Sequence, residues 1–268
     1  IDVCGRVVAV GEQISRDRIG ERVLIEPCLW EVQGQTLEQP WFLGSECGGG
    51  FAEYTVVAAR HAHPIDSVYS DTELASFPCS YSTAENLLTR TAVSSEDRVL
   101  ITGASGGVGS AAVQLAKARG ADVVAVTSAS KTQAILDLGA DVAIARGKSF
   151  LTVPGRNSVD VVIDLVAGEQ WPELLAVLRP KGRYAVAGAV AGPLVELDVR
   201  TLYLKDLSFF GCTALEPNVF PNLIRQIERQ HIRPLTAKVF PLEQIVAAQQ
   251  AFLAKDYVGK IVLQVAED

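Results

Sequence analysis

The segment at residues 98–109, Arg-Val-Leu-Ile-Thr-Gly-Ala-Ser-Gly-Gly-Val-Gly, constrains the fold of this chain more than any other. It predicts an apolar strand, then a glycine-dense turn, then a helix over 107–119 whose apolar positions recur at helical spacing. Glycine lets backbone N–H groups approach an anion closely, and the N-terminus of a helix favours negative charge. Residues 121–127 predict a second strand at the distance that a βαβ unit requires.

This turn favours binding of the pyrophosphate of a dinucleotide. Ala104 stands where the usual G-x-G-x-x-G pattern has its first glycine, so the flanking strands support the prediction more than the glycines do. The alternative is a glycine-rich turn without a ligand. The residues predicted to line the pyrophosphate are Ser105, Gly106, Gly107, Val108 and Gly109.

The end of the second strand bears on the choice of cofactor. An NAD site normally has an acidic residue here for the ribose 2′-hydroxyl, whereas this chain has Thr127, Ser128 and Lys131. Hydroxyl and ammonium groups suit a 2′-phosphate, and Arg146 follows the next predicted strand. We therefore expect NADPH rather than NADH, the alternative being that both cations are ordinary solvated charges.

Composition narrows the class of protein. The chain has 268 residues, 49% of them hydrophobic and 21% charged, enough for one large or two medium domains. It contains neither an 18-residue apolar run nor a signal-peptide pattern, and its net charge is −7 without a basic stripe. We expect a cytoplasmic protein that binds neither membranes nor nucleic acid.

Cysteine and histidine provide no clear metal motif. The five cysteines are odd in number and never form C-x-x-C, which argues against a disulfide framework or a four-cysteine zinc site. His61 and His63 lack a third ligand at suitable spacing and are expected at the surface. Asp164 either lines a cofactor cleft or caps the turn that follows it. The cysteines are Cys4, Cys28, Cys47, Cys79 and Cys212.

Two kinds of pattern follow one another along the chain. Residues 1–80 predict short strands, including 6–10, 22–26 and 51–58, whereas strands and helices alternate from residue 98 onward, which predicts a parallel, doubly wound sheet. Two helices, 218–230 and 242–254, and a strand, 259–265, complete the chain. Because it starts at Ile1 inside a strand-like run and contains no Met, we expect its beginning to be missing.

Several separated segments, taken together, resemble the medium-chain dehydrogenase/reductase superfamily, in particular its quinone oxidoreductase-like or zinc-binding alcohol dehydrogenase-like branch. The resemblance covers nearly the whole chain. Its segments are residues 2–11, 20–27, 49–54 (Gly-Gly-Phe-Ala-Glu-Tyr), 83–88, 104–109 and 258–263 (Val-Gly-Lys-Ile-Val-Leu).

The resemblance implies an α/β fold in which a Rossmann domain is inserted into a truncated GroES-like, β-rich catalytic domain. The implied domains are 1–82 (catalytic, N-terminal part missing), 83–214 (Rossmann) and 215–268 (return to the catalytic domain), with the active site between them. It further implies a homodimer formed through the edge strand at 207–210. The cofactor contacts it implies are Thr83 at the nicotinamide, Gly188 and Ala189 along the cofactor, and Gly211 and Thr213 near the carboxamide.

This sequence departs from the family at the positions of the zinc ligands. The resemblance places Ile1 at the position of a histidine ligand and Asp2 at that of the following glutamate, so only Cys79 matches a ligand. One ligand cannot hold zinc, so we expect a zinc-free enzyme with Cys79 as a packed thiol near the nicotinamide.

The predicted function is NADPH-dependent hydride transfer to a quinone, enone or other carbonyl acceptor, with no catalytic residue assigned. Three alternatives remain open. One is a zinc-dependent alcohol dehydrogenase, and another is a non-catalytic NADPH-binding protein. The third is an α/β-hydrolase, since residues 103–107 also fit G-x-S-x-G with Ser105 as nucleophile and His231 as the sole downstream histidine.

Overall fold

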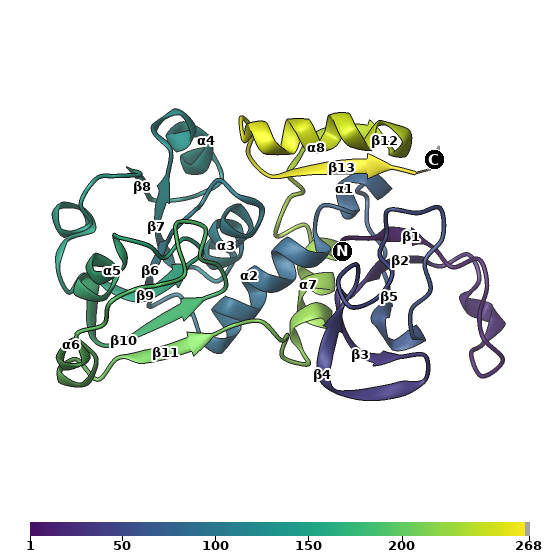
Figure 1. Cartoon of the computed structure of the whole chain (residues 1–268), viewed down its shortest axis with the longest axis horizontal. Coiled ribbons are helices and arrows are strands. Elements are labelled where there is room, and N and C mark those ends of the chain that lie inside the picture. The colour runs from purple at the N-terminus through teal and green to yellow at the C-terminus, as the bar shows by residue number, and fades with distance from the viewer. Residues whose placement is uncertain (266–268) are drawn as a thin grey trace. The chain divides into compact units, whose positions relative to one another are not determined.

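The computed structural model describes residues 1–265 and divides into two compact units. Unit 1 consists of Ile1–Ser82 with Ala214–Asp268, and unit 2 of Thr83–Thr213. Figure 1 labels their elements, and each unit is described by itself. The helix α2 (Pro78–Arg90) contributes residues to both.

Unit 2 is built on a parallel six-stranded sheet with the order β11-β10-β9-β6-β7-β8. Chain order reverses between β6 and β9, which is the topological switch point where doubly wound sheets bind ligands. The predicted doubly wound α/β fold is therefore confirmed. The strands are β6 (Arg98–Ile101), β7 (Asp122–Thr127), β8 (Val142–Ala145), β9 (Val159–Asp164), β10 (Leu178–Val186) and β11 (Ser208–Gly211).

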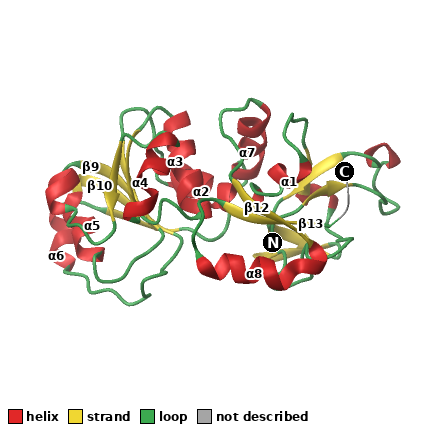
Figure 2. Ribbon diagram, turned by 90° about the horizontal axis from the view of Figure 1, so that it is seen from above, coloured by secondary structure: helices red, strands yellow, loops and turns green. Residues whose placement is uncertain are grey.

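Helices cover both faces of this sheet, which explains why its central strands are apolar on both sides. In the two views α3 and α4 lie on one side and α5 and α6 on the other (Figures 1 and 2). Ala111, Ala112 and Leu115 of α3 are buried, as the periodicity predicts. The helices are α3 (Gly107–Ala118), α4 (Thr132–Asp137), α5 (Trp171–Val177) and α6 (Val199–Leu204), with short turns η3 (Ala129–Lys131) and η4 (Leu151–Gly155).

Unit 1 is rich in short strands. An antiparallel sheet has the order β1-β2-β5, from β1 (Cys4–Arg6), β2 (Arg22–Ile25) and β5 (Ala62–Pro64). A hairpin joins β3 (Cys28–Val32) to β4 (Gln35–Phe42), and α8 (Ile245–Ala254) runs alongside the parallel pair β12 (Thr236–Pro241) and β13 (Lys260–Gln264) (Figure 2). The remaining elements are η1 (Arg16–Arg18), η2 (Ala59–His61), α1 (Asp71–Leu74), α7 (Val219–Glu228) and η5 (Leu242–Gln244).

Two predicted strands of unit 1 differ from the structure. The first ends at Arg6 rather than at residue 10, and residues 51–58 form no strand even though their composition favours one. Val56 is 95% exposed, and no described strand pairs with this segment. Extended sequence becomes a strand only where a neighbour accepts its hydrogen bonds, which local pattern cannot specify.

No helix within residues 1–265 has the length and apolar character that crossing a membrane requires.

Candidate cofactor site

The glycine turn after β6 has a backbone that larger residues would not fit. Gly103 has φ +62°, and its carbonyl oxygen accepts a hydrogen bond from the Gly106 amide at 3.0 Å. A Cβ atom on Gly109 would overlap that same oxygen and lie 2.7 Å from Ala104 Cα. Glycine is thus required at 109 so that α3 can begin directly against the turn.

The first turn of α3 provides donors for an anion. Its N-cap is Gly106, which has no side chain to cap the helix, and the first turn contains no acidic residue. The amides at the start of a helix lack intrahelical partners, and the helix dipole favours a negative charge beside them. This end of the helix therefore fits a pyrophosphate.

Ser105 lies in this turn without the geometry of a nucleophile elbow. That motif places the serine on a sharp, strained turn, whereas the left-handed residue here is Gly103. His231, the histidine that the hydrolase alternative requires, is exposed, with its Nδ1 2.9 Å from the Gln226 side-chain oxygen.

The four predicted 2′-phosphate residues come together at the carboxyl ends of β7 and β8. The Arg146 amide donates to the Thr127 carbonyl at 2.6 Å, and the Lys131 amide to the Ser128 carbonyl at 3.0 Å. Thr127 Oγ1 is buried and has no hydrogen-bond partner among the described residues. An unsatisfied buried hydroxyl is costly, so a ligand that bonds to it would be favoured here.

The remaining predicted contacts lie at the ends of the other strands of unit 2 or in α2. Gly188 approaches the turn after β9 so closely that a Cβ atom would lie 2.8 Å from the Leu165 carbonyl oxygen, and Ala189 beside it is exposed. Gly211 ends β11 in register with Val186 of β10. Thr213 is exposed and Thr83 is half-buried. Contact of these residues with a cofactor stays a prediction.

A buried polar network beside the glycine turn went largely unpredicted. The Asp164 carboxylate is fully buried and accepts hydrogen bonds from Thr102 Oγ1 at 2.6 Å and the Tyr184 hydroxyl at 2.7 Å. Trp171 Nε1 donates to that hydroxyl at 2.9 Å. Burial and the neighbouring carboxylate raise the pKa of Tyr184, so its hydroxyl stays protonated and donates. These residues are far apart in the sequence, so no local pattern connects them. The sequence predicted a role for Asp164 alone among them.

The surroundings of Cys79 do not fit a zinc centre. Its amide donates to Asp2 Oδ1 at 2.6 Å, and Asp2 Oδ2 accepts from Lys260 Nζ at 2.8 Å. Burial alone would lower the pKa of Lys260, but the charge and hydrogen bond of Asp2 outweigh it, so the ammonium group stays charged. Within residues 1–265 no three His, Cys, Asp or Glu side chains are grouped to hold a metal.

The expectation of surface histidines is wrong for His61, which is 1% exposed. Its Nε2 accepts hydrogen bonds from the amides of Trp30 and Glu31 at 3.1 and 3.2 Å, and its Nδ1 lies 3.4 Å from Glu26 Oε2. His63 Nε2 lies 3.1 Å from the same oxygen. These contacts join β3 to η2, and they join both histidines to Glu26, the residue that follows β2.

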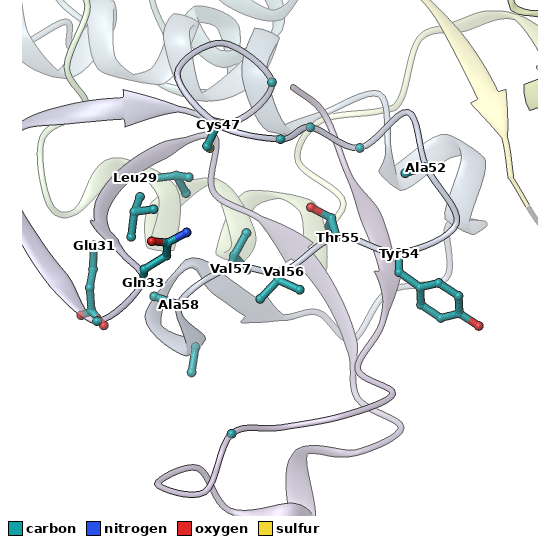
Figure 3. Close-up of a pocket in the computed structure, with 18 of the residues that line it drawn as sticks. Leu29, Glu31, Gln33, Cys47, Ala52, Tyr54, Thr55, Val56, Val57 and Ala58 are labelled. Atoms are coloured by element: carbon teal, nitrogen blue, oxygen red, sulfur yellow. The ribbon is translucent and has the colours of Figure 1, made fainter.

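Unit 1 also contains an open cavity of about 1200 Å³ between this hairpin and residues 44–59. Figure 3 shows Leu29, Gln33 and Val57 facing one another there, while Tyr54 points away. Gly49 on its wall has a packing reason, because a Cβ atom there would lie 2.9 Å from Gly44 Cα. The glycine turn after β6 does not line this cavity.

Family models match both units. Residues 1–67 match the alcohol dehydrogenase GroES-like domain and residues 107–229 the zinc-binding dehydrogenase domain. Fold and turn thus define an oxidoreductase with a Rossmann-type site. The chain belongs to the medium-chain dehydrogenase/reductase superfamily, as its sequence predicts.

Two curated relatives are an acryloyl-coenzyme A reductase and a quinone oxidoreductase. An acryloyl-coenzyme A reductase of Metallosphaera sedula is 31% identical over 272 residues, which cover 98% of this chain and 81% of the relative. A quinone oxidoreductase of Rattus norvegicus is 26% identical over 276 residues, covering 98% and 78% of the two chains.

Solved structures show the same fold. A Sinorhizobium meliloti 1021 protein, provisionally assigned as an alcohol dehydrogenase, matches with a TM-score of 0.90 and 44% identity, over 98% of this chain and 74% of that chain. The 2-octenoyl-CoA carboxylase reductase CinF, solved with NADP and 2-octenoyl-CoA, matches with a TM-score of 0.88 and 26% identity, over 98% and 66%.

Proposed function

We propose that this protein is an NADPH-dependent reductase of conjugated carbonyl compounds, such as quinones, enones or α,β-unsaturated thioesters. The observation that carries the proposal is the unsatisfied, buried Thr127 hydroxyl at the end of β7, in a segment of hydroxyl and cationic residues without an acid. The relatives that act on acryloyl-CoA and on quinones have acceptors with a carbonyl conjugated to a double bond, which supports the substrate class.

The chain's own residues would bind and orient the cofactor. The amides at the start of α3 would hold its pyrophosphate, and Thr127, Ser128, Lys131 and Arg146 its adenosine ribose phosphate. When bound, the reduced nicotinamide supplies a hydride to the acceptor. We propose chemistry that needs no metal, because Ile1 and Asp2 stand where the family resemblance places a histidine ligand and the glutamate that follows it.

The test is a titration with NADPH and NADH followed by nicotinamide fluorescence. In a Lys131→Ala variant we expect NADPH affinity to fall about tenfold, since a charged hydrogen bond to phosphate contributes about 1.4 kcal/mol when partly exposed, while NADH affinity stays unchanged. Lys148→Ala removes an exposed charge nearby and should change neither affinity.

Equal weakening of both cofactors in Lys131→Ala would contradict the 2′-phosphate site, and binding of neither cofactor by the unaltered chain would contradict the dinucleotide site itself. Oxidation of NADPH by a panel of quinones, enones and enoyl-CoA thioesters then tests the substrate class. Turnover of saturated ketones alone would overturn it.

A further inference from the structure

Asp164 is placed where stability alone does not explain a carboxylate. It ends β9 beside the topological switch point and is fully buried. Besides the hydroxyls of Thr102 and Tyr184, its Oδ1 accepts from the amides of Val166 and Ala167 at 3.0 and 3.1 Å. None of these four donors is a cation. A buried charge is costly, and an apolar residue at such a position is often as stabilising, so stability alone does not account for this carboxylate.

Thr102 connects the carboxylate to the glycine turn. Its Oγ1 donates to Asp164 and accepts from the Leu165 amide at 2.9 Å, while its own amide donates to the Ile163 carbonyl at 3.0 Å. The next residue, Gly103, begins the turn with φ +62°. One hydroxyl thus joins the last residue before the turn to the segment 165–168 after β9.

The segment 165–168 lies against both glycine-containing loops of the predicted cofactor site. A Cβ atom on Gly103 would lie 3.2 Å from Val166 Cγ2, and one on Gly188 would lie 2.8 Å from the Leu165 carbonyl oxygen. The Ala191 amide also donates to the Val166 carbonyl at 2.9 Å. A shift of this segment would therefore displace the turn at 103 or the loop at 188.

We propose that Asp164, acting through Thr102 and the segment 165–168, is a positioning residue that sets the glycine turn for pyrophosphate. The proposal rests on the proposed function, because it takes the turn to be the site of a dinucleotide. Asp164 itself contacts no cofactor atom in this role. Asp164 keeps the glycine turn ordered in the free protein, so that cofactor binding does not incur the entropy cost of ordering it.

The experiment compares Thr102→Val with Thr102→Ser, and Asp164→Asn with Asp97→Asn, in the full chain. Thr102→Val keeps the shape of the side chain but removes the hydroxyl, and Thr102→Ser retains it. Asp97 is the matched control, since it is 8% exposed and bonded to Arg183 and to the Ser94 amide at 2.8 Å, but precedes β6 at the opposite end of that strand. Each variant is titrated with NADPH, ADP-ribose 2′-phosphate and 2′-AMP, and its urea unfolding is recorded.

We expect Thr102→Val and Asp164→Asn to raise the Kd of the two pyrophosphate ligands about tenfold, with 2′-AMP changed by less than about twofold. Thr102→Ser should bind like the unaltered chain, and Asp97→Asn should lose stability without losing affinity. Unchanged affinities in Thr102→Val, or equal weakening of all three ligands, would overturn the positioning role. If the unaltered chain bound no NADPH, the proposed function would fail instead, so the two failures are distinguishable.

Discussion

At the scale of single residues, two glycines of the same turn have different physical reasons. Gly109 packs against the backbone of Gly103 and Ala104, so that any side chain there would overlap main-chain atoms. Gly106 has an extended backbone with φ −78° and ψ 171°, and a Cβ atom on it would lie an acceptable 3.4 Å from the Gly103 oxygen. Of these two positions, only 109 requires glycine for the turn to pack.

Substitution by alanine should separate these two roles. We expect Gly109→Ala to lower the free energy of unfolding by about 2 kcal/mol or more, because the backbone must move to accommodate the methyl group. Gly106→Ala should change stability by less than about 1 kcal/mol yet weaken NADPH binding, since its methyl group stands where the pyrophosphate would approach. Urea unfolding and NADPH titration measure the two effects. Normal NADPH affinity in Gly106→Ala would show that the ligand does not approach this side of the turn.

At the scale of elements, Glu26, His61 and His63 fasten the β3–β4 hairpin to the sheet of unit 1. Burial raises the pKa of Glu26, but the hydrogen bonds from both histidines outweigh it and leave that pKa below its ordinary value of 4.5. A carboxylate whose pKa is lowered by folding stabilises the folded state. This stabilisation is complete at any pH well above the pKa that the carboxylate has in the unfolded chain. This stabilisation is lost as the pH falls through the folded pKa.

The variant Glu26→Gln tests this contribution. At pH 7 we expect its free energy of unfolding to be about 1–3 kcal/mol lower than that of the unaltered chain, which is typical of losing charged hydrogen bonds at a mostly buried site. The difference should shrink as the pH falls below 4.5, where the carboxylate becomes protonated. Urea unfolding from pH 3.5 to 7, followed by tryptophan fluorescence, suits the purpose because Trp30 and Trp41 belong to the hairpin. A difference that is constant with pH would contradict the depressed pKa.

Elements of unit 2 were more predictable than those of unit 1. β7 was predicted to within one residue of its first and at its last, and α3 from its first residue to within one of its last, because buried parallel strands and an amphipathic helix each have a strong local pattern. Residues 51–58 have an equally strand-like composition but lack a partner among the described strands. The β3–β4 hairpin, in contrast, was not predicted, since its polar and exposed positions weaken the alternation.

At the scale of the whole molecule, we propose a homodimer through β11. This strand is the last in the sheet order, so one of its edges has no described strand beside it, and Phe209 within it is 38% exposed. An unpaired apolar edge is a template for pairing with a second copy.

A lysine on this edge should oppose such pairing. We expect Ser208→Lys to shift the protein from dimer to monomer in sedimentation velocity at micromolar concentration, because each copy would bring a charge to the shared edge. Thr152→Lys, at an exposed position outside the strand, should leave the association unchanged. An unaltered chain that already sediments as a monomer would contradict the proposed dimer.

The sequence by itself determined the order of the strands in unit 2, the glycine turn with the helix that follows it, and the hydroxyl and cationic residues after β7, because each depends on residues close together in the chain. Only the tertiary structure decided that His61 is buried, that Thr127 Oγ1 lacks a partner within residues 1–265, and that Thr102, Asp164 and Tyr184 form one network. Those features depend on residues brought together from up to 82 positions apart by sheet pairing. Long-range pairing leaves no periodic trace in a single sequence, whereas local hydrogen bonding and helical spacing do.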